Sequence, residues 1–580
     1  MMAQPRVLLT PWGEQLDGER PLPEYPRPQL QRDSYLNLNG VWQHAFRISA
    51  RRPEQWDGPI VVPFSPEAVL SGVGRQLQPG EYLHYQRSFD LPAGFRSDRV
   101  MLHFGAVDQW CRITLNGSVV GEHDGGFLPF SVDVTDSCSD TDNDLHVVVQ
   151  DPSDTGPGAR GKQKLQPGGI WYTAQSGIWQ TVWLESVPEL HVTGLTLEPD
   201  LTGATITVRT THPTPVTIGM RDGDVALATA AGTAGQPLRI DVPEPHLWTP
   251  DDPHLYELTV RAGADEVASY VGLRTFGIAP DAGGRARLLL NGQPYFHAGV
   301  LDQGYWSDGL LTAASDEALI FDIQTMKDMG FTMLRKHIKV EPLRWYHHCD
   351  RIGMLVWQDM VNGGGPYRRR VVELPAVSPV RFDDRHRRLF SREDDHARAQ
   401  WLSETRETVE LLRNSPCVAA WVPFNEGWGQ FDANEVAETV RLLDPSRPVD
   451  HASGWHDQGG GDFHSLHVYF RPFRVPRKPD PRVLALSEYG GYSLHLSEHS
   501  ASPTEFGYRR YSSVADLAAA FRRLHADQII PAIPKGLSAT VYTQVSDVED
   551  ETNGLLTFDR RVVKIPVDEV RQVIQRLRVD

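Results

Sequence analysis

The sequence is poor in cysteine. Four cysteines occur in 580 residues, Cys111, Cys138, Cys349 and Cys417. No two of them show the close spacing of a metal or redox motif, so we expect reduced thiols. No HExxH motif occurs either, and the histidines are better suited to binding hydroxyl groups than zinc. The sequence therefore predicts no metal and no other cofactor.

Long apolar runs and excess positive charge are also missing. No stretch of 18 apolar residues exists, which argues against a membrane-spanning helix. The first residues, MMAQPRVLLTPWGEQLDG, hold only a short apolar patch and no signal-peptide core, so we expect a cytoplasmic protein. The formal net charge is -18, which disfavours nucleic acid and anionic membranes as partners.

What is present indicates several globular domains. The length exceeds what one core supports, and 40% hydrophobic residues with 15 tryptophans predict well-packed structure. Residues 1–188 contain short alternating strands and Asn-Gly turns at 39–40 and 116–117, typical of a jelly-roll β-sandwich. Residues 189–279 show about seven short strands, which favours an immunoglobulin-like β-sandwich.

From residue 280 to residue 580 the pattern predicts a (β/α)8 TIM barrel, because strands alternate with amphipathic helices. One such helix should begin after Ser315, a good N-cap residue. Residues 362–394 are rich in Pro, Gly and Arg without periodicity, and a mobile cover, an oligomer contact or a substrate role are all open. The eight expected strands are 295–301, 331–337, 354–359, 418–426, 448–453, 463–469, 483–488 and 538–547.

Two of these strands end in a glutamate. Glu426 follows the apolar run Val418–Phe424, and Glu488 follows Val483–Leu486. Hydrolysis of a glycosidic bond needs two carboxyl groups, one to protonate the leaving oxygen and one to stabilise the oxocarbenium-like centre. Each glutamate alone is as readily explained as a helix cap or an arginine partner, but the matching strand contexts favour a catalytic pair.

At these residues the chain resembles glycoside hydrolase family 2, the family of β-galactosidases, β-glucuronidases and β-mannosidases. The resemblance is found in WVPFNEGWGQ (421–430) and SEYG (487–490). It implies that Glu426 is the acid/base and Glu488 the nucleophile of a retaining double displacement. It also implies that Asn425 binds the sugar 2-hydroxyl, and that Arg335 and Tyr469 contact the nucleophile. We expect Arg335 to lower the pKa of Glu488, while burial keeps Glu426 protonated.

Other polar and aromatic residues at the strand ends are expected to complete a sugar pocket. Trp421, Trp428, Tyr469 and Tyr489 offer rings that stack on a pyranose face. From the first domain, Asp108, Trp110 and 125–127 are more simply loop packing than pocket rim. The remaining candidate substrate-binding residues are Asp302, His337, Asp359, Trp455, His467 and Gln544.

The sugar itself is harder to read from the sequence. Glucuronidases of the family grip the sugar carboxylate with an Asn-x-Lys-Gly motif, and TQVSDVEDETNG (543–554) has no such lysine. We therefore expect an exo-acting β-galactosidase-like enzyme acting on a small glycoside. A galactofuranoside, arabinoside, glucuronide or mannoside remains open, as do a homo-oligomer and a non-catalytic carbohydrate-binding protein.

Overall fold

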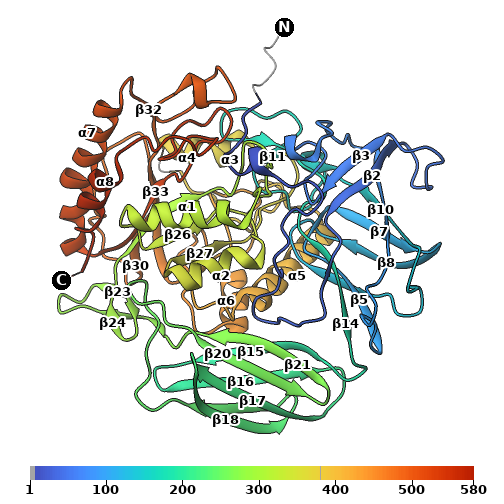
Figure 1. Ribbon diagram of the computed structural model, residues 1–580. Helices are drawn as coiled ribbons and strands as arrows, with labels where there is room; N and C mark the ends of the chain where they lie inside the picture. Colours follow the sequence, from blue (N-terminus) through green and yellow to red (C-terminus); the bar gives the residue numbers. More distant parts are fainter. Residues whose placement is uncertain (1–6, 379, 580) are drawn as a thin grey trace.

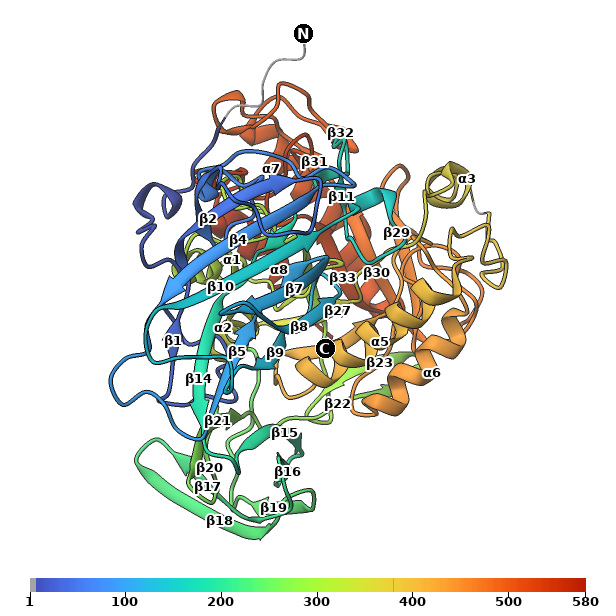
Figure 2. The same ribbon diagram turned by 90° about the vertical axis from the view of Figure 1, so that its right-hand side faces the viewer.

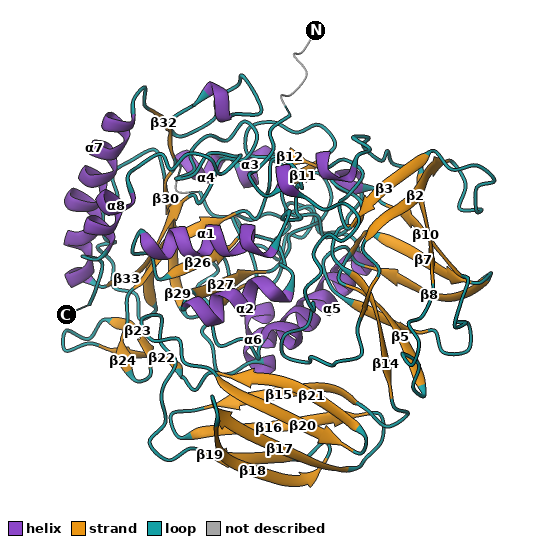
Figure 3. Ribbon diagram, in the orientation of Figure 1, coloured by secondary structure: helices purple, strands orange, loops and turns teal. Residues whose placement is uncertain are grey.

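A computed structural model describes residues 7–378 and 380–579. Figure 1 shows three parts: an N-terminal β-sandwich, a second β-sandwich, and a C-terminal barrel that contacts both. In Figure 3 the α-helices gather around the barrel, and the two sandwiches consist mainly of strands and loops. Within the described residues, no helix is both long and apolar enough to cross a membrane.

The N-terminal part packs two antiparallel sheets face to face. Alternate residues of its strands point inward, as in Trp110–Leu115, where Cys111, Ile113 and Leu115 are buried. One sheet has the order β1 (Leu36–Asn37), β14 (Val182–Val187), β5 (Arg99–Phe104), β9 (Phe130–Asp133). The other has the order β3 (Gly58–Val62), β2 (Gly40–Arg47), β4 (Tyr82–Phe89), β10 (Asn143–Gln150), β7 (Trp110–Leu115), β8 (Ser118–Asp124). Two short pairs join β6 (Val107–Asp108) to β13 (Gly177–Ile178), and β11 (Gln163–Lys164) to β12 (Tyr172–Thr173).

The second sandwich has seven strands, as its turn spacing predicted. Its β-branched residues alternate inward and outward, so a small core forms between the sheets. One sheet has the order β15 (Val192–Pro199), β16 (Gly203–Thr210), β19 (Pro237–Asp241). The other has the order β18 (Val225–Thr233), β17 (Pro215–Asp222), β20 (Tyr256–Ala262), β21 (Asp265–Val271). A small sheet of β22 (Phe276–Pro280), β23 (Ala286–Leu290) and β24 (Gln293–Pro294) leads to the barrel.

Seven parallel strands form the barrel wall. Their order is β28 (Val418–Val422), β27 (Leu355–Asp359), β26 (Met333–Lys336), β25 (His297–Asp302), β33 (Leu537–Thr543), β30 (Val483–Gly490), β29 (Phe463–Val468). The predicted strand at 448–453 is wrong as a regular strand: it makes only two isolated parallel bridges to the chain at and after β28, Trp421 to Val449 and Asn425 to Ser453. Pro448 has no backbone donor and Gly454 turns the chain away at a φ of 86°, so the pairing stays short.

Helices cover most of the outer wall. Ser315 caps α1 (Asp316–Asp328) as predicted, because its side chain accepts from the Ala318 N–H. The other helices are α2 (Leu343–Ile352), α5 (Asp395–Leu412), α6 (Ala433–Leu443), α7 (Val514–Leu524) and α8 (Val567–Ile574). Residues 454–482, which comprise β29 (Phe463–Val468) and the loops on either side of it, contain no helix.

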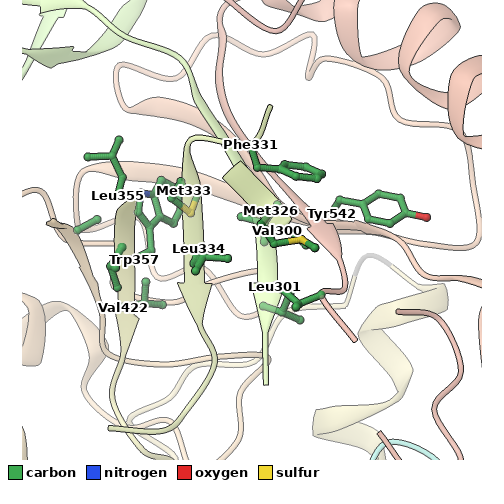
Figure 4. Close-up of a cluster of buried hydrophobic side chains, with 14 of the residues drawn as sticks. Val300, Leu301, Met326, Phe331, Met333, Leu334, Leu355, Trp357, Val422 and Tyr542 are labelled. Carbon is green, nitrogen blue, oxygen red and sulfur yellow. The ribbon is translucent and has the colours of Figure 1, made fainter. Parts of the chain in front are cut away.

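The barrel core is apolar and continuous. Figure 4 shows side chains of neighbouring strands and of α1 filling one buried cluster. Because both faces of these strands are covered, they are apolar runs without alternation, as a parallel sheet requires. The labelled residues are Val300, Leu301, Met326, Phe331, Met333, Leu334, Leu355, Trp357, Val422 and Tyr542.

The described residues of the arginine-rich segment 362–394 form loop and two single-turn helices, α3 (Arg369–Val372) and α4 (Leu374–Val377). Its start meets the N-terminal sandwich, where Ala159 bridges Gly363 and the Arg160 N–H donates to the Asn362 carbonyl at 2.9 Å. The segment therefore joins the barrel to the first domain. Its predicted roles as a cover or an oligomer contact stay predictions.

Candidate active site

The two glutamates lie at the carboxyl ends of their strands. Glu488 belongs to β30, and Glu426 follows β28 by four residues. Glu426 adopts a left-handed backbone with a φ of 50°, followed by Gly427 at 73°. A non-glycine residue in this region costs about 1 kcal/mol or more, so the surrounding bonds must hold it there. The Glu426 N–H does so by donating to the Ser453 carbonyl at 3.0 Å.

The two carboxyl groups face each other in a buried site. A carboxylate oxygen of Glu426, one of Glu488 and a ring nitrogen of His467 lie within 4.8 Å of one another. Glu426 is 7% exposed and Glu488 is 4% exposed. This closeness matches the carboxyl separation of about 5 Å in retaining glycosidases and is shorter than the roughly 6.5 Å or more of inverting ones.

Arg335, at the end of β26, orients this site. Its guanidinium is fully buried and forms a two-bond pair with Asp359, at 3.0 Å for each bond. Its remaining N–H groups donate to Glu488 Oε1 at 3.2 Å and to Asn425 Oδ1 at 2.9 Å. Asp359 therefore acts on the site through Arg335, because it holds the cation that bonds Glu488.

Tyr469 and His467 bind the two glutamates from the end of β29. The Tyr469 hydroxyl donates to Glu488 Oε2, and its ring stacks on Tyr508 with centroids 3.8 Å apart. His467 places Nδ1 2.8 Å from Glu426 Oε1 and 3.6 Å from Glu488 Oε2. Its Nε2 lies 3.1 Å from Ser453 Oγ. One imidazole thus connects the two carboxyl groups.

Burial shifts the pKa values of Glu426 and His467 away from their values in water. It raises the pKa of Glu426 to about 8, because Lys162 and Arg335 offset only part of the desolvation. Burial also lowers the pKa of His467 to about 4, so the ring is neutral at pH 7. A protonated Glu426 beside a neutral imidazole is suited to general acid catalysis.

Arg335 acts to lower the pKa of Glu488, as expected, but the net shift of this pKa is upward. Burial raises the pKa of this carboxyl, while His467, Arg335 and Tyr469 act to lower it. Because His467 is itself neutral at pH 7, Arg335 supplies the standing positive charge. Arg335 therefore limits the rise in the pKa of Glu488. The net upward shift could not be predicted, because the sequence alone does not show how completely the site is buried.

Three buried nitrogens of the predicted site residues have no hydrogen-bond partner among the described residues. They are Asn425 Nδ2, His337 Nε2 and Gln544 Nε2. His337 is fixed through its other nitrogen, which lies 2.8 Å from Gln303 Oε1, and Gln303 Nε2 donates to Gln544 Oε1 at 2.7 Å. Buried polar atoms without partners are uncommon, so these three are good candidates to bind a polar ligand.

The other predicted site residues have different surroundings. Trp455 lies beside the site, with its ring 6.4 Å from that of His467. The Asp302 carboxylate accepts from Lys336 Nζ at 2.7 Å and from the Gly304 N–H at 2.9 Å, within a buried ion network. Trp421 and Tyr489 are not sugar-stacking rings, because both are buried and bond Asp444 and His525.

Residues of the first domain also contact the site, although no motif in the sequence indicated them. Lys162 Nζ lies 3.4 Å from Glu551 Oε2, and the Tyr172 hydroxyl donates to that same oxygen. Trp171 packs against Trp428 at 5.0 Å between centroids. These residues fall in 151–181, a long irregular stretch with many glycines, and such loops often have functional roles. Asp108, by contrast, is buried and accepts from Gln163.

Family models match three successive parts of the chain. The glycosyl hydrolase 2 galactose-binding domain-like model covers residues 76–177, and the glycosyl hydrolases family 2 model covers residues 190–274. The family 2 TIM barrel domain model covers residues 285–473. The chain belongs to glycosyl hydrolase family 2. The family predicted from the Asn-Glu and Ser-Glu-Tyr-Gly motifs is therefore confirmed, and so is the fold class of two β-sandwiches and a TIM barrel.

Relatives within family 2 have different sugars in their names. A β-galactosidase of Thermoanaerobacter pseudethanolicus is 23% identical over 63% of this chain and 48% of its own length. A β-glucuronidase of Paenibacillus borealis is 25% identical over 73% of this chain and 74% of its own length. The β-glucuronidase structure of Ruminococcus gnavus has a TM-score of 0.74 at 18% identity, covering 96% of this chain and 99% of that chain. The chain spans about half the length of the curated β-galactosidases that it matches.

Proposed function

We propose that the chain is a retaining exo-β-glycosidase of family 2, and that Glu426 and Glu488 perform a double displacement. The observation that best supports this is the pair of buried carboxyl groups within 4.8 Å of each other, joined by His467. That distance leaves no room for a water between the carboxyl groups, as an inverting mechanism needs.

In the first step, a carboxylate oxygen of Glu488 attacks the anomeric carbon while Glu426 gives its proton to the leaving oxygen. The glycosidic bond breaks, and a glycosyl ester of Glu488 forms. In the second step, Glu426 takes a proton from water, and the water oxygen attacks the same carbon and releases Glu488. Arg335 and Tyr469 hold Glu488 in position for both steps.

The surroundings of the pair favour a pocket for one terminal sugar. The first domain contacts the barrel at Gly363 and at Trp428. These contacts limit the space for an open cleft in which a sugar chain could extend in both directions. Asn425 Nδ2, His337 Nε2 and Gln544 Nε2 are free to bond sugar hydroxyls. A bond from Asn425 to the 2-hydroxyl should strengthen in the transition state.

A neutral sugar is the favoured glycone, with a β-galactoside as the first candidate. The buried cations near the pair already have carboxylate partners: Arg335 bonds Asp359 and Glu488, and Lys162 lies beside Glu551. A uronate carboxylate would compete with these partners. The relatives named as β-glucuronidases make a uronide the second candidate.

A panel of nitrophenyl glycosides tests the proposal. It should include pyranosides and furanosides, both anomers, and β-glucuronide beside β-galactoside. We expect one β-glycoside to be hydrolysed. NMR of the reaction should show that the β-anomer of the free sugar is released first. Release of the α-anomer first would contradict the retaining mechanism. Hydrolysis of the glucuronide alone would contradict the choice of a neutral sugar.

The pH profile should show an alkaline limb near pH 8. Above the raised pKa of Glu426 the acid loses its proton and can no longer protonate the leaving oxygen. We expect kcat/KM for an alkyl glycoside to fall about tenfold per pH unit there. The measurement is kcat/KM from pH 5 to pH 10. Glu426→Gln should lose this limb, and a limb that persists in the variant would assign it to another group.

Chelation should leave activity unchanged. Glu426, His467 and Glu488 form the one cluster in the described part of the chain with donor atoms close enough to hold a metal ion. Arg335 already bonds Glu488, and a divalent cation there would face its positive charge. We expect the same kcat after exhaustive dialysis against EDTA. A loss restored by one metal would show that the cluster binds it.

A further inference from the structure

A large groove lies along the outside of the barrel wall at β29. Its volume is about 1020 Å³, and its walls come from three loops. The groove exists because the chain has no helix in residues 454–482, where a regular barrel would cover this strand. Figure 2 shows β29 in this uncovered region, beside the segment that contains α3. The loops that line it, hereafter the basic groove, are 375–378, 380–381, 454–461 and 471–482.

The charge of the basic groove is opposite to that of the whole protein. The chain has a net charge of -18, yet six arginines and lysines line this groove against two aspartates. The aspartates are already paired: Asp457 bonds Arg482 at 2.8 Å and lies 3.5 Å from Arg381, and Asp480 also bonds Arg482. The other four cations, Arg471, Arg474, Arg477 and Lys478, are exposed and have no ion pair with any described residue.

The backbone that carries these cations is restrained. The segment FRPFRVPRKPDPR, residues 470–482, contains four prolines, each of which fixes a backbone angle. Phe473 anchors it in the core and is 6% exposed. A backbone restrained in this way loses less entropy when an anion binds.

The basic groove starts beside the acid/base. Gly454, Trp455 and His467 line it, and they follow or contact the residues that hold Glu426. Ser453 accepts from the Glu426 N–H, and His467 Nδ1 lies 2.8 Å from Glu426 Oε1. The leaving group departs on the side of the acid, so the rest of the substrate lies toward Trp455 and the groove. Half-buried Trp455 offers a ring for a sugar face.

We propose that the basic groove binds the aglycone of the substrate, and that this aglycone is an acidic glycan bearing carboxylate or sulfate groups. Arginine is well suited to both groups, because its planar donors match two oxygens at once. The inference rests on the proposed glycosidase, since the groove is assigned to the leaving-group side. The glycone pocket takes a neutral sugar, and the basic groove takes the charged chain beyond it.

The test uses Arg474→Glu/Arg477→Glu. The matched control is Arg221→Glu/Arg406→Glu, which changes the charge equally at two exposed arginines outside the groove. Calorimetric titrations with trigalacturonate, a sulfated trisaccharide and a neutral galactose trisaccharide use the Glu488→Ala background, so that nothing is hydrolysed. We expect the groove variant to bind the acidic probe at least tenfold more weakly, and the control to match the parent. Added salt at about 0.5 M should weaken binding to the parent in the same way.

Three results would overturn the proposal: no binding of either acidic probe, equal binding of acidic and neutral probes, or equal losses in the two variants. If the groove variant instead turns a dimer into a monomer by light scattering and trigalacturonate does not bind, the groove holds a second copy of this acidic chain. The Arg221→Glu/Arg406→Glu control should keep kcat/KM on the nitrophenyl glycoside when Glu488 is intact. If the parent does not hydrolyse the nitrophenyl glycoside, the proposed glycosidase function is rejected. If the parent hydrolyses it but binds no acidic probe, only the proposed role of the basic groove is rejected.

Discussion

Glu488→Ala is expected to reduce kcat/KM by at least about 10⁴-fold on every substrate of the panel. The variant has no nucleophile to form the glycosyl ester, and neither Glu426 nor a water in this site can replace it. The loss should be similar for good and poor leaving groups, because both require the same covalent step. Rates on nitrophenyl and alkyl glycosides, compared with the parent, measure it.

Glu404→Ala provides the control. Glu404 is another glutamate with a pKa raised by burial, but it lies on α5, where the Gln400 side chain donates to it at 3.1 Å. The variant should keep the parent activity, which would show that removing a half-buried carboxyl with a raised pKa is not enough to stop turnover. Azide should rescue Glu488→Ala and yield a glycosyl azide of inverted configuration. A folded Glu488→Ala that keeps more than about 1% of activity would mean that another group is the nucleophile.

The central part of the site could be predicted because strand ends in a barrel converge. Apolar runs ending in Glu426, Glu488 and Arg335 are local patterns, and the fold alone brings them together. Tyr469 was predicted from the family resemblance, and its hydroxyl does bond Glu488. The strand ends therefore predicted this site without any knowledge of side-chain directions.

The rest of the site depends on contacts that no local pattern encodes. Lys162 meets Glu551 across 389 residues of sequence, and Trp171 meets Trp428 from another domain. Residues 151–181 have no periodicity, so nothing in the sequence indicates which side chains reach the barrel. Trp421 was wrongly predicted as a sugar-stacking ring for a different reason. It lies in the right strand, but its ring points into the core and bonds Asp444.

The irregular part of the barrel explains both the wrong strand prediction at 448–453 and the groove beside β29. The segment 448–453 pairs with the chain at and after β28 through two bridges only, although its sequence suggested a full strand. The next two connections lack helices, so the outer face of β29 borders a groove and not a packed helix. Sequence periodicity indicates which elements exist, but it does not show that a helix is missing or what its absence opens.

Glu426→Gln is expected to cost about 10²- to 10⁴-fold in kcat/KM on glycosides with poor leaving groups. Glutamine keeps the size of the side chain and its place beside His467, so the change removes mainly the acidic proton. A dinitrophenyl glycoside needs no protonation of its leaving oxygen, so its first step should be almost unaffected. Equal losses on both substrates would show that Glu426 is not the acid.

The same variant separates the two roles of Glu426. With a dinitrophenyl substrate the ester of Glu488 should accumulate, because the amide introduced by Glu426→Gln cannot take a proton from the attacking water. Azide needs no such base, so it should restore turnover and give a glycosyl azide of retained configuration. The opposite configurations expected from Glu426→Gln and Glu488→Ala would assign acid/base and nucleophile independently of any rate. If both variants gave the same configuration, the two assignments could not both be correct.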